Sequence, residues 1–374
     1  MTEKQFRNKV TWFSFVFSLL VIWVHSYNAE LFLGRTEEMA LVYRAEHWLG
    51  DYVSQIAVPG FFMISGYLFY RNFTWEKLQE KWDRRIRSLL TPYILWNFLY
   101  YLGYVAGSRL PWVTDVVGKG EVPFTLSHMV DAVISYRYNY VFWYLYQLIL
   151  LTALAPVLYQ VLKRSWGQWI FLALVAWLVV RDVRLPFLNA DALAYYGIAA
   201  ALGLETQAWR ECRVCSGRDH GGEERSGADC GGSGNGLPWY LPEAGWSLRG
   251  GLSGAGMIGL AALFYYLGLS SAQAAGFVAC RLLAVFGLWL LVPGERLPEP
   301  KAFMCHNFFL YATHFAFVRF INKAAALVLP AGLWVPFVLF LVMPFLALAL
   351  STLLGACLRR AVPGMWDLLN GYRI

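Results

Sequence analysis

The sequence has little charge for its length. Only 15% of its 374 residues are Asp, Glu, Lys or Arg, whereas a soluble globular domain carries roughly 25%. Hydrophobic residues make up 58% of the chain, and the mean hydropathy is +0.46. So few charges do not cover the surface of a water-soluble fold, which excludes a soluble domain and predicts a polytopic membrane protein.

Several signatures of other protein classes are also missing. No small-residue cleavage site closes the first apolar stretch, so we expect that stretch to be a membrane helix rather than a secretory signal. No internal repeat stands out, which weakens a transporter built from paired halves. What the chain has instead is aromatic residues, at 17% of the total, and aromatic rings favour the two interfaces of a bilayer.

Apolar runs of membrane-spanning length recur along the chain. A spanning helix needs about 20 mostly apolar residues, and the fifth to seventh runs are short or weak. We therefore predict an all-α membrane helix bundle of about ten transmembrane helices, near residues 11–33, 52–70, 89–107, 140–162, 168–181, 192–205, 252–270, 274–293, 302–322 and 331–357.

Basic residues in the short loops predict the orientation. Lys and Arg favour the cytoplasmic side, and they cluster in the N-terminal tail, after the second run, after the fourth and after the tenth. The intervening loop 34–51 is acid-rich. Both termini are therefore predicted to be cytoplasmic, in a multi-pass membrane protein.

One segment differs from the rest and divides the chain into three parts. Residues 1–205 and 251–374 form the first six and the remaining membrane helices, and residues 206–250 are polar and rich in Gly, Cys and Arg. Three interpretations stay open: a disordered cytoplasmic loop, a reading-frame error that hides parts of two helices, and a metal site. The metal site would use zinc-type ligands, namely Cys212, Cys215, His220 and Cys230. The segment has one CxxC pair without a second, so we predict no metal.

Two histidines interrupt apolar helices at similar depth. His25 lies 14 residues after Thr11, which is about 21 Å from the cytoplasmic face at 1.5 Å per residue. His314 lies 12 residues after Ala302, about 18 Å from the same face. Ionisable groups inside a membrane are costly and indicate function by default, although a single one is easily structural. Two at matched depth predict one polar cavity, with Tyr311 on the same helical face as His314.

Two further features lie in the second apolar run and just before the third. The pair Ser65-Gly66 allows another backbone to approach closely, as in ordinary small-residue membrane packing. A basic cluster opens the next helix, and it is either a topology anchor that meets lipid headgroups or a dock for a phosphorylated cytosolic substrate, because guanidinium pairs bidentately with phosphate. The cluster comprises Lys81, Arg84, Arg85 and Arg87.

Five motifs in order resemble the acyltransferase-3 family of integral membrane O-acyltransferases. They are "LLVIWVHSYN", "VPGFFMISGYLFYR", "RRIRSLLTPYILW", "VFWYLYQLILL" and "FFLYATHFAF". The similarity in order and spacing runs from about residue 10 to 205 and from about 255 to 357. Each motif is weakly specific alone, and the five together are strong.

The resemblance implies an enzyme that moves an acyl group, by default acetyl, from cytosolic acyl-CoA to a hydroxyl of a cell-envelope carbohydrate. By position, His25 corresponds to the catalytic base, with His314 and Tyr311 in support. The basic cluster would bind acyl-CoA, which is the one expected co-substrate, and Ser65 and Trp143 would contact substrate. The expected partners are the lipid bilayer and an envelope glycan or lipid-linked sugar acceptor, with no nucleic acid.

Two departures from the family pattern keep alternatives open. Ser14 stands where the family usually has an arginine, and Tyr146-Gln147 replaces an Arg-Asp pair. A transporter or flippase of an envelope metabolite would use the same histidines as a proton relay. A sensory protein with an intact cavity and lost chemistry is a third interpretation.

Overall fold

The computed structural model describes residues 1–34, 37–111, 120–218, 238, 240–271, 274–330 and 332–373. These residues form helices joined by turns, with no strand among them, as the hydropathy pattern predicts. The helices are α1 (Glu3–Val24), α2 (Ala29–Leu33), α3 (Glu37–His47), α4 (Ala57–Tyr70), α5 (Leu78–Arg85), α6 (Thr91–Gly107), α8 (Leu126–Ile134), α9 (Trp143–Ala153), α10 (Ala155–Leu162), α11 (Ser165–Val180), α12 (Ala190–Arg218), α13 (Leu248–Ser271), α14 (Ala274–Leu291), α15 (Asn307–Val328), α16 (Trp334–Ala361) and α17 (Pro363–Asn370).

Helical structure covers each of the ten predicted runs, but fewer helices meet the criteria for crossing a membrane. Among the described residues, five helices are long and apolar enough. A sixth span results if the bent pair Tyr140–Ala153 and Ala155–Leu162 counts as one. The chain is thus an all-helical membrane protein with five or six candidate spans, and the count of about ten and the cytoplasmic termini stay predictions.

The chain divides into two compact units. The first unit comprises Met1–Ser14, Val58–Lys81 and Ala153–Pro300, and the second comprises Phe15–Ala57, Trp82–Thr152 and Lys301–Ile374. Each unit therefore draws on distant parts of the sequence.

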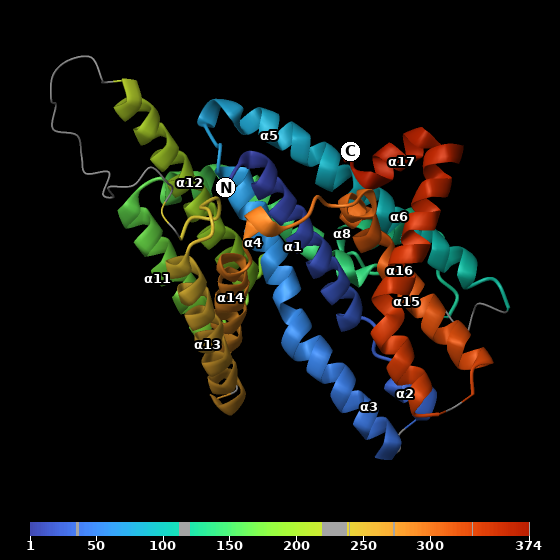
Figure 1. Ribbon diagram of the computed structural model, residues 1–374. Coiled ribbons are helices and arrows are strands. Elements are labelled where there is room, and N and C mark those ends of the chain that lie inside the picture. The colour runs from blue at the N-terminus through green and yellow to red at the C-terminus, as the bar shows by residue number, and fades with distance from the viewer. Residues whose placement is uncertain are drawn as a thin grey trace. The chain divides into compact units, whose positions relative to one another are not determined.

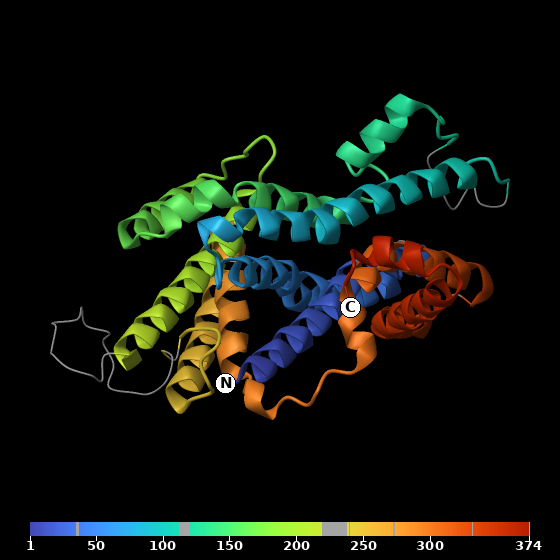
Figure 2. The same cartoon turned by 90° about the horizontal axis from the view of Figure 1, so that it is seen from above.

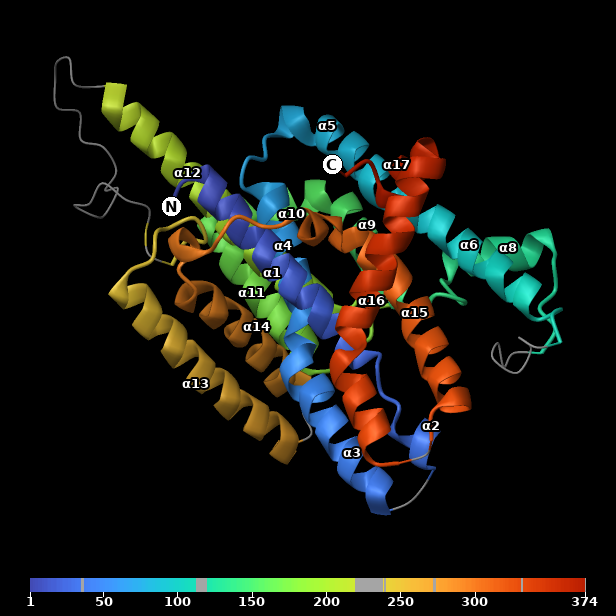
Figure 3. The same ribbon diagram turned by 45° about the vertical axis from the view of Figure 1, so that its right-hand side comes forward.

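In the first unit, glycines allow helices to pack closely. Helices α13 and α14 lie side by side (Figures 1 and 3), and a Cβ on Gly254 would lie 2.7 Å from the Gly287 carbonyl oxygen. A Cβ on Gly66 of α4 would lie 2.4 Å from the Tyr196 carbonyl oxygen of α12. The close backbone approach predicted from Ser65-Gly66 is therefore confirmed, and it is the small-residue packing typical of membrane helices.

In the second unit, α15 packs beside α16 (Figures 1 and 3), and α8 lies beside α6 (Figure 2). The Tyr100 hydroxyl of α6 donates to the Ala312 carbonyl oxygen of α15 at 3.0 Å. One apolar core joins the end of α1 to α15 and α16, and its buried members are Ile22, Leu310, Val318, Met343 and Ala347. This core places the end of α1 against the middle of α15.

The polar segment 206–250 is described only at its two ends. We expected the sixth apolar run to end at residue 205, but α12 continues to Arg218. The prediction of a loop, a frame error or a metal site falls largely on residues 219–237 and 239, which lie outside the described residues, as do the side chains of Cys215, His220 and Cys230. Those interpretations stay predictions.

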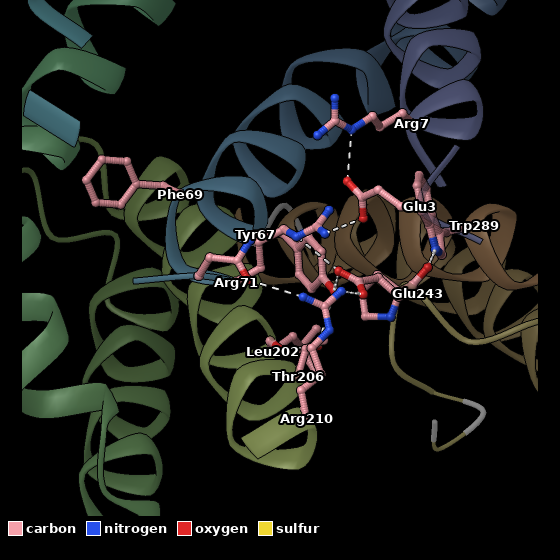
Figure 4. A network of polar contacts seen from close by, with 12 residues as sticks. Glu3, Arg7, Tyr67, Phe69, Arg71, Leu202, Thr206, Arg210, Glu243 and Trp289 are labelled. Atoms are coloured by element: carbon pink, nitrogen blue, oxygen red, sulfur yellow. Dashed lines mark hydrogen bonds and ion pairs between the residues drawn. The ribbon is translucent and has the colours of Figure 1, made fainter. Parts of the chain in front are cut away.

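Both ends of that segment join a buried polar network of the first unit (Figure 4). Glu243 pairs with Arg210, and it lies 3.1 Å from Nε of Arg71. Arg71 also pairs with Glu3 at 2.6 Å, and the Tyr67 hydroxyl donates to Glu243 at 3.0 Å. Segments from the start, the fourth helix and the middle of the chain thus meet through charge pairing.

Candidate active site

His25 lies where α1 ends. The backbone N–H of His25 donates to the Ile22 carbonyl oxygen at 3.0 Å, and that of Ser26 donates to Trp23 at 3.0 Å, so the last turn is tighter than an α-helix. The Ser26 hydroxyl also donates to Ile22, at 2.5 Å. Ser and Asn side chains compete with the helical backbone for hydrogen bonds, so the polar run after Val24 ends the helix and leaves His25 at its tip.

Three aromatic side chains surround the His25 ring, all within the second unit. The ring centroids of His25 and His314 lie 5.5 Å apart. The Phe315 ring is 5.9 Å from His25, and the hydroxyl of Tyr140 lies 3.1 Å from His25 Nδ1. The two histidines that we predicted to share a cavity are therefore neighbours. Tyr140 is a third member that the sequence did not indicate.

The tautomer of His314 follows from its hydrogen bond. Its Nδ1 lies 2.6 Å from the Tyr311 carbonyl oxygen, and because a carbonyl only accepts, Nδ1 carries the proton. The other ring nitrogen, Nε2, is buried and has no hydrogen-bond partner in the part of the chain that the structure describes. Neutral His314 therefore presents a lone pair in a fully buried setting.

Tyr311 holds this arrangement through two groups. Its carbonyl oxygen accepts from His314, and its hydroxyl donates to the Val141 carbonyl oxygen at 2.6 Å. The hydroxyl proton is therefore used by a backbone carbonyl, and the two contacts hold His314 and the segment that contains Val141. A catalytic role for Tyr311 stays a prediction. Trp143, another residue predicted to contact substrate, is the first residue of α9, two positions after Val141, and is half-buried.

A buried polar cluster fixes the chain just after His25. The Glu46 carboxylate accepts the backbone N–H groups of Asn28 and Ala29 at 3.1 and 3.3 Å. The Asn28 side chain donates to Asn322 Oδ1 of α15 at 3.2 Å. Through Asn28, this cluster ties the His25 segment to the helix that carries His314.

The three arginines of the predicted basic cluster lie where α5 ends and in the turn before α6, which we call the basic turn. Arg84 and Arg85 end α5, and Arg87 belongs to the π-helical turn Ile86–Leu90. Arg84 and Arg87 are exposed and Arg85 is half-buried. Pro92, near the start of α6, lacks an N–H and favours a helix start there. The three guanidinium groups thus belong to the second unit, as do both catalytic candidates.

The C-terminus adds an arginine that the sequence did not point to. Helix α17 ends at Gly371, whose φ is +67° and where a Cβ would lie 2.8 Å from the Ser88 carbonyl oxygen. This approach brings Arg373 to the basic turn. Burial, and then the charge of Arg85, lower the pKa of Arg373 to about 9. A cation that is destabilised in this way is well suited to bind an added anion.

Two predicted site residues belong to the first unit. Lys81 donates to the Phe69 carbonyl oxygen at 2.6 Å and lies 5.2 Å from the centroid of the Phe69 ring. Ser65 is a half-buried residue of α4 next to the tightly packed Gly66. The structure thus gives Lys81 and Ser65 packing roles inside their own unit. Their contact with a substrate stays a prediction.

No group of three or more His, Cys, Asp or Glu side chains that could hold a metal ion occurs within the described ranges. What the second unit offers is an imidazole pair, a tyrosine hydroxyl and a cluster of arginines. Imidazoles exchange protons near neutral pH, and arginines bind phosphate groups.

The chain matches the model of a known family. The family model described as an acyltransferase domain matches residues 9–356, nearly the whole chain. No curated protein matches the chain, and neither does any solved structure.

Proposed function

Because the chain belongs to the acyltransferase-3 family, and is thus an acyltransferase of the membrane, we propose that it moves an acyl group, by default acetyl, from cytosolic acyl-CoA to a hydroxyl of a cell-envelope carbohydrate. The membrane is then a bacterial-type cytoplasmic membrane. The observation that carries the proposal is the contact between His25 and His314, whose ring centroids lie 5.5 Å apart. The family match covers the positions of both residues.

His25 is the general base of this proposal. We assign the ring proton of His25 to Nδ1, which then donates to the Tyr140 hydroxyl oxygen 3.1 Å away. This assignment leaves the lone pair on Nε2, the tautomer that a base at Nε2 requires. Nε2 takes the proton of the acceptor hydroxyl while its oxygen attacks the thioester carbonyl carbon. The tetrahedral intermediate then expels the CoA thiolate, and the imidazolium returns the proton to that sulfur.

Tyr140 and His314 support the charges that develop. The Tyr140 hydroxyl accepts from His25 and keeps its own proton free for the oxyanion of the intermediate. His314 stays neutral because its Nδ1 proton is held by Tyr311. A neutral His314, whose ring centroid lies 5.5 Å from that of His25, adds no positive charge that would oppose the imidazolium forming on His25.

The donor binds at the basic turn in this proposal. The phosphates of acyl-CoA pair with Arg84, Arg85, Arg87 and Arg373, because guanidinium matches phosphate in geometry and charge. Lys81 is the weakest member of the group, since its ammonium already donates to Phe69. This arrangement takes the donor from the cytosol and passes the acyl group to an acceptor that reaches the site from the envelope side.

The test is acyl transfer in membranes that contain wild type or His25→Ala. Acetyl-CoA labelled in the acetyl group is supplied, and the label is followed into glycolipid and polysaccharide. We expect label with wild type and a loss of at least about a hundredfold with His25→Ala, the usual contribution of a general base. The matched control is His128→Ala, since His128 hydrogen-bonds Thr125 at the start of α8, outside the imidazole pair.

Each other outcome has a definite meaning. Equal label with wild type and His25→Ala, both correctly folded, keeps the enzyme and removes His25 from the base role. No label with either folded protein contradicts the acyltransferase proposal. That result would favour the transporter interpretation, which predicts dependence on a pH gradient and no requirement for CoA.

A further inference from the structure

A pocket between α6 and α15 adjoins the imidazole pair. It has a volume of about 350 Å³ and lies entirely within the second unit. Its wall is mainly aromatic, with Trp96, Tyr100 and Tyr104 from α6 and Phe315 from α15. Among the residues that line it, Arg319 alone carries a charge.

Phe315 connects this pocket to the proposed catalytic group. Its ring forms part of the pocket wall, and it also lies 5.9 Å from the His25 ring and 4.7 Å from the Tyr140 ring. A molecule in the pocket therefore lies one aromatic ring away from His25. Arg319 is five residues beyond His314, about 7.5 Å along the helix axis, so a group bound there is separated from the imidazole pair by a short distance.

The charge of Arg319 has no counterpart within the described part of the chain. Its guanidinium donates to the Tyr104 hydroxyl at 2.7 Å and lies 5.6 Å from the Phe315 ring centroid. No described carboxylate pairs with it, although the side chain is half-buried between apolar helices. A charge withdrawn from water is normally paired. The partner that suits Arg319 is an anion that the described residues do not supply.

The other residues of the pocket wall limit the chemical class of the ligand. A neutral sugar needs several polar partners, but the Tyr100 hydroxyl is already used by the Ala312 carbonyl oxygen. Acyl-CoA carries several phosphates, and this pocket has one cation. One anion together with a largely apolar surface fits an amphiphile with a single phosphate next to a hydrocarbon chain.

We propose that this pocket binds the acceptor as a lipid-linked sugar phosphate, with the phosphate at Arg319 and the lipid chain along the aromatic wall. The sugar hydroxyl then extends past Phe315 to His25. The inference rests on the proposed function for the identity of the acceptor, but the binding of a lipid phosphate does not depend on catalysis.

The test measures binding of a radiolabelled long-chain polyprenyl phosphate to the immobilised full chain in neutral detergent, without acyl-CoA. Two variants alter the pocket by different means. Arg319→Gln removes the cation, and Gly103→Leu fills the pocket, because a Cβ on Gly103 meets no atom within 4 Å. The matched controls are Arg360→Gln, an exposed arginine of α16, and Gly259→Leu, an equally open glycine of α13.

We expect Arg319→Gln to weaken binding by about tenfold or more, the effect of losing a charge-assisted hydrogen bond. We expect a loss of similar size in Gly103→Leu, because the leucine side chain occupies the space of the ligand. Both controls should bind like wild type. Neutral polyprenol and phosphatidylglycerol should compete poorly. If Arg319→Gln fails to fold, Gly103→Leu decides alone, since leucine in place of glycine favours the helix.

Wild-type affinity in both folded pocket variants overturns the proposal, and so does equal competition by phosphatidylglycerol, which would show a general site for anionic lipids. Binding with no acyl transfer from labelled acetyl-CoA keeps this pocket and contradicts the proposed function. Acyl transfer with no binding of polyprenyl phosphate keeps the proposed function and contradicts this pocket.

Discussion

The hydroxyl oxygen of Tyr140 lies 3.1 Å from Nδ1 of His25. These residues come from the end of α1 and from the turn before α9, and both also contact the ring of Phe315. The contact fixes the orientation of one imidazole nitrogen and leaves the other for chemistry. Tyr140 is therefore proposed to position the base and to assist the oxyanion.

Tyr140→Phe should lower the kcat of acyl transfer about tenfold, which corresponds to about 1.4 kcal/mol, the size of one hydrogen bond. The KM for acyl-CoA should not change, because the ring that packs on Phe315 is kept. The measurement is the rate of label transfer at saturating acetyl-CoA over a range of pH. The pH profile should shift in the variant, since the hydrogen bond to Nδ1 biases the protonation of His25.

Tyr266→Phe provides the control for that experiment. Tyr266 is an exposed residue of α13 with 68% of its surface accessible, and the loss of its hydroxyl should leave both kcat and the pH profile as in wild type. A Tyr140→Phe protein with wild-type kcat and an unshifted profile would remove Tyr140 from the mechanism.

Arg373→Met should weaken the binding of CoA. The guanidinium lies 4.0 Å from the Phe308 ring centroid and donates to the Asn370 carbonyl oxygen at 3.0 Å, and Met keeps an apolar side chain against that ring. We expect CoA to raise the Tm of wild type, and this rise should shrink in Arg373→Met, because binding to the native state alone stabilises it. The affinity should fall about tenfold.

Comparing the binding of CoA with that of 3′-dephospho-CoA shows whether the arginines bind the 3′-phosphate. If Arg85 and Arg373 meet the 3′-phosphate, wild type should prefer CoA and Arg373→Met should lose most of that preference. An Arg84→Gln/Arg85→Gln double variant should raise the KM for acyl-CoA more than it lowers kcat. An unchanged KM in that variant would show that the basic turn is a topology anchor and not the donor site.

The fold was predictable where one physical property dominates. Apolar runs located the helices, and the rise per residue placed His25 and His314 at matched depth before any contact was known. The end of α12 was predicted too early, because the apolar run stops near residue 205 while good helix formers such as Gln207, Ala208 and Arg210 continue.

The partners of the site residues were not predictable. Nothing in the sequence around Tyr140 or Arg373 indicates that one meets His25 and the other meets the basic turn. Those contacts depend on the packing of segments more than a hundred residues apart. The unpaired charge of Arg319 was likewise visible only with the neighbouring helices in place.

The buried network around Glu243 gives the last prediction. The Glu243 side chain is 6% exposed and that of Arg71 is 8% exposed, and Arg210 is the second partner of the carboxylate. Glu243→Gln leaves two arginines without their shared anion, which should destabilise the protein by about 3–5 kcal/mol. The measurement is the Tm in detergent, together with the yield of folded protein.

The exposed pair Lys4–Glu299 is the matched control, since both side chains are 73% exposed. Glu299→Gln should leave the Tm close to that of wild type, because water and salt screen such a pair. In an Arg71→Gln/Glu243→Gln double variant the loss should be smaller than the sum of the two single losses, since Arg71 and Glu243 are in direct contact at 3.1 Å and each single change already removes that pair. If Glu243→Gln is as mild as Glu299→Gln, the network does not hold the two ends of segment 206–250 in the fold.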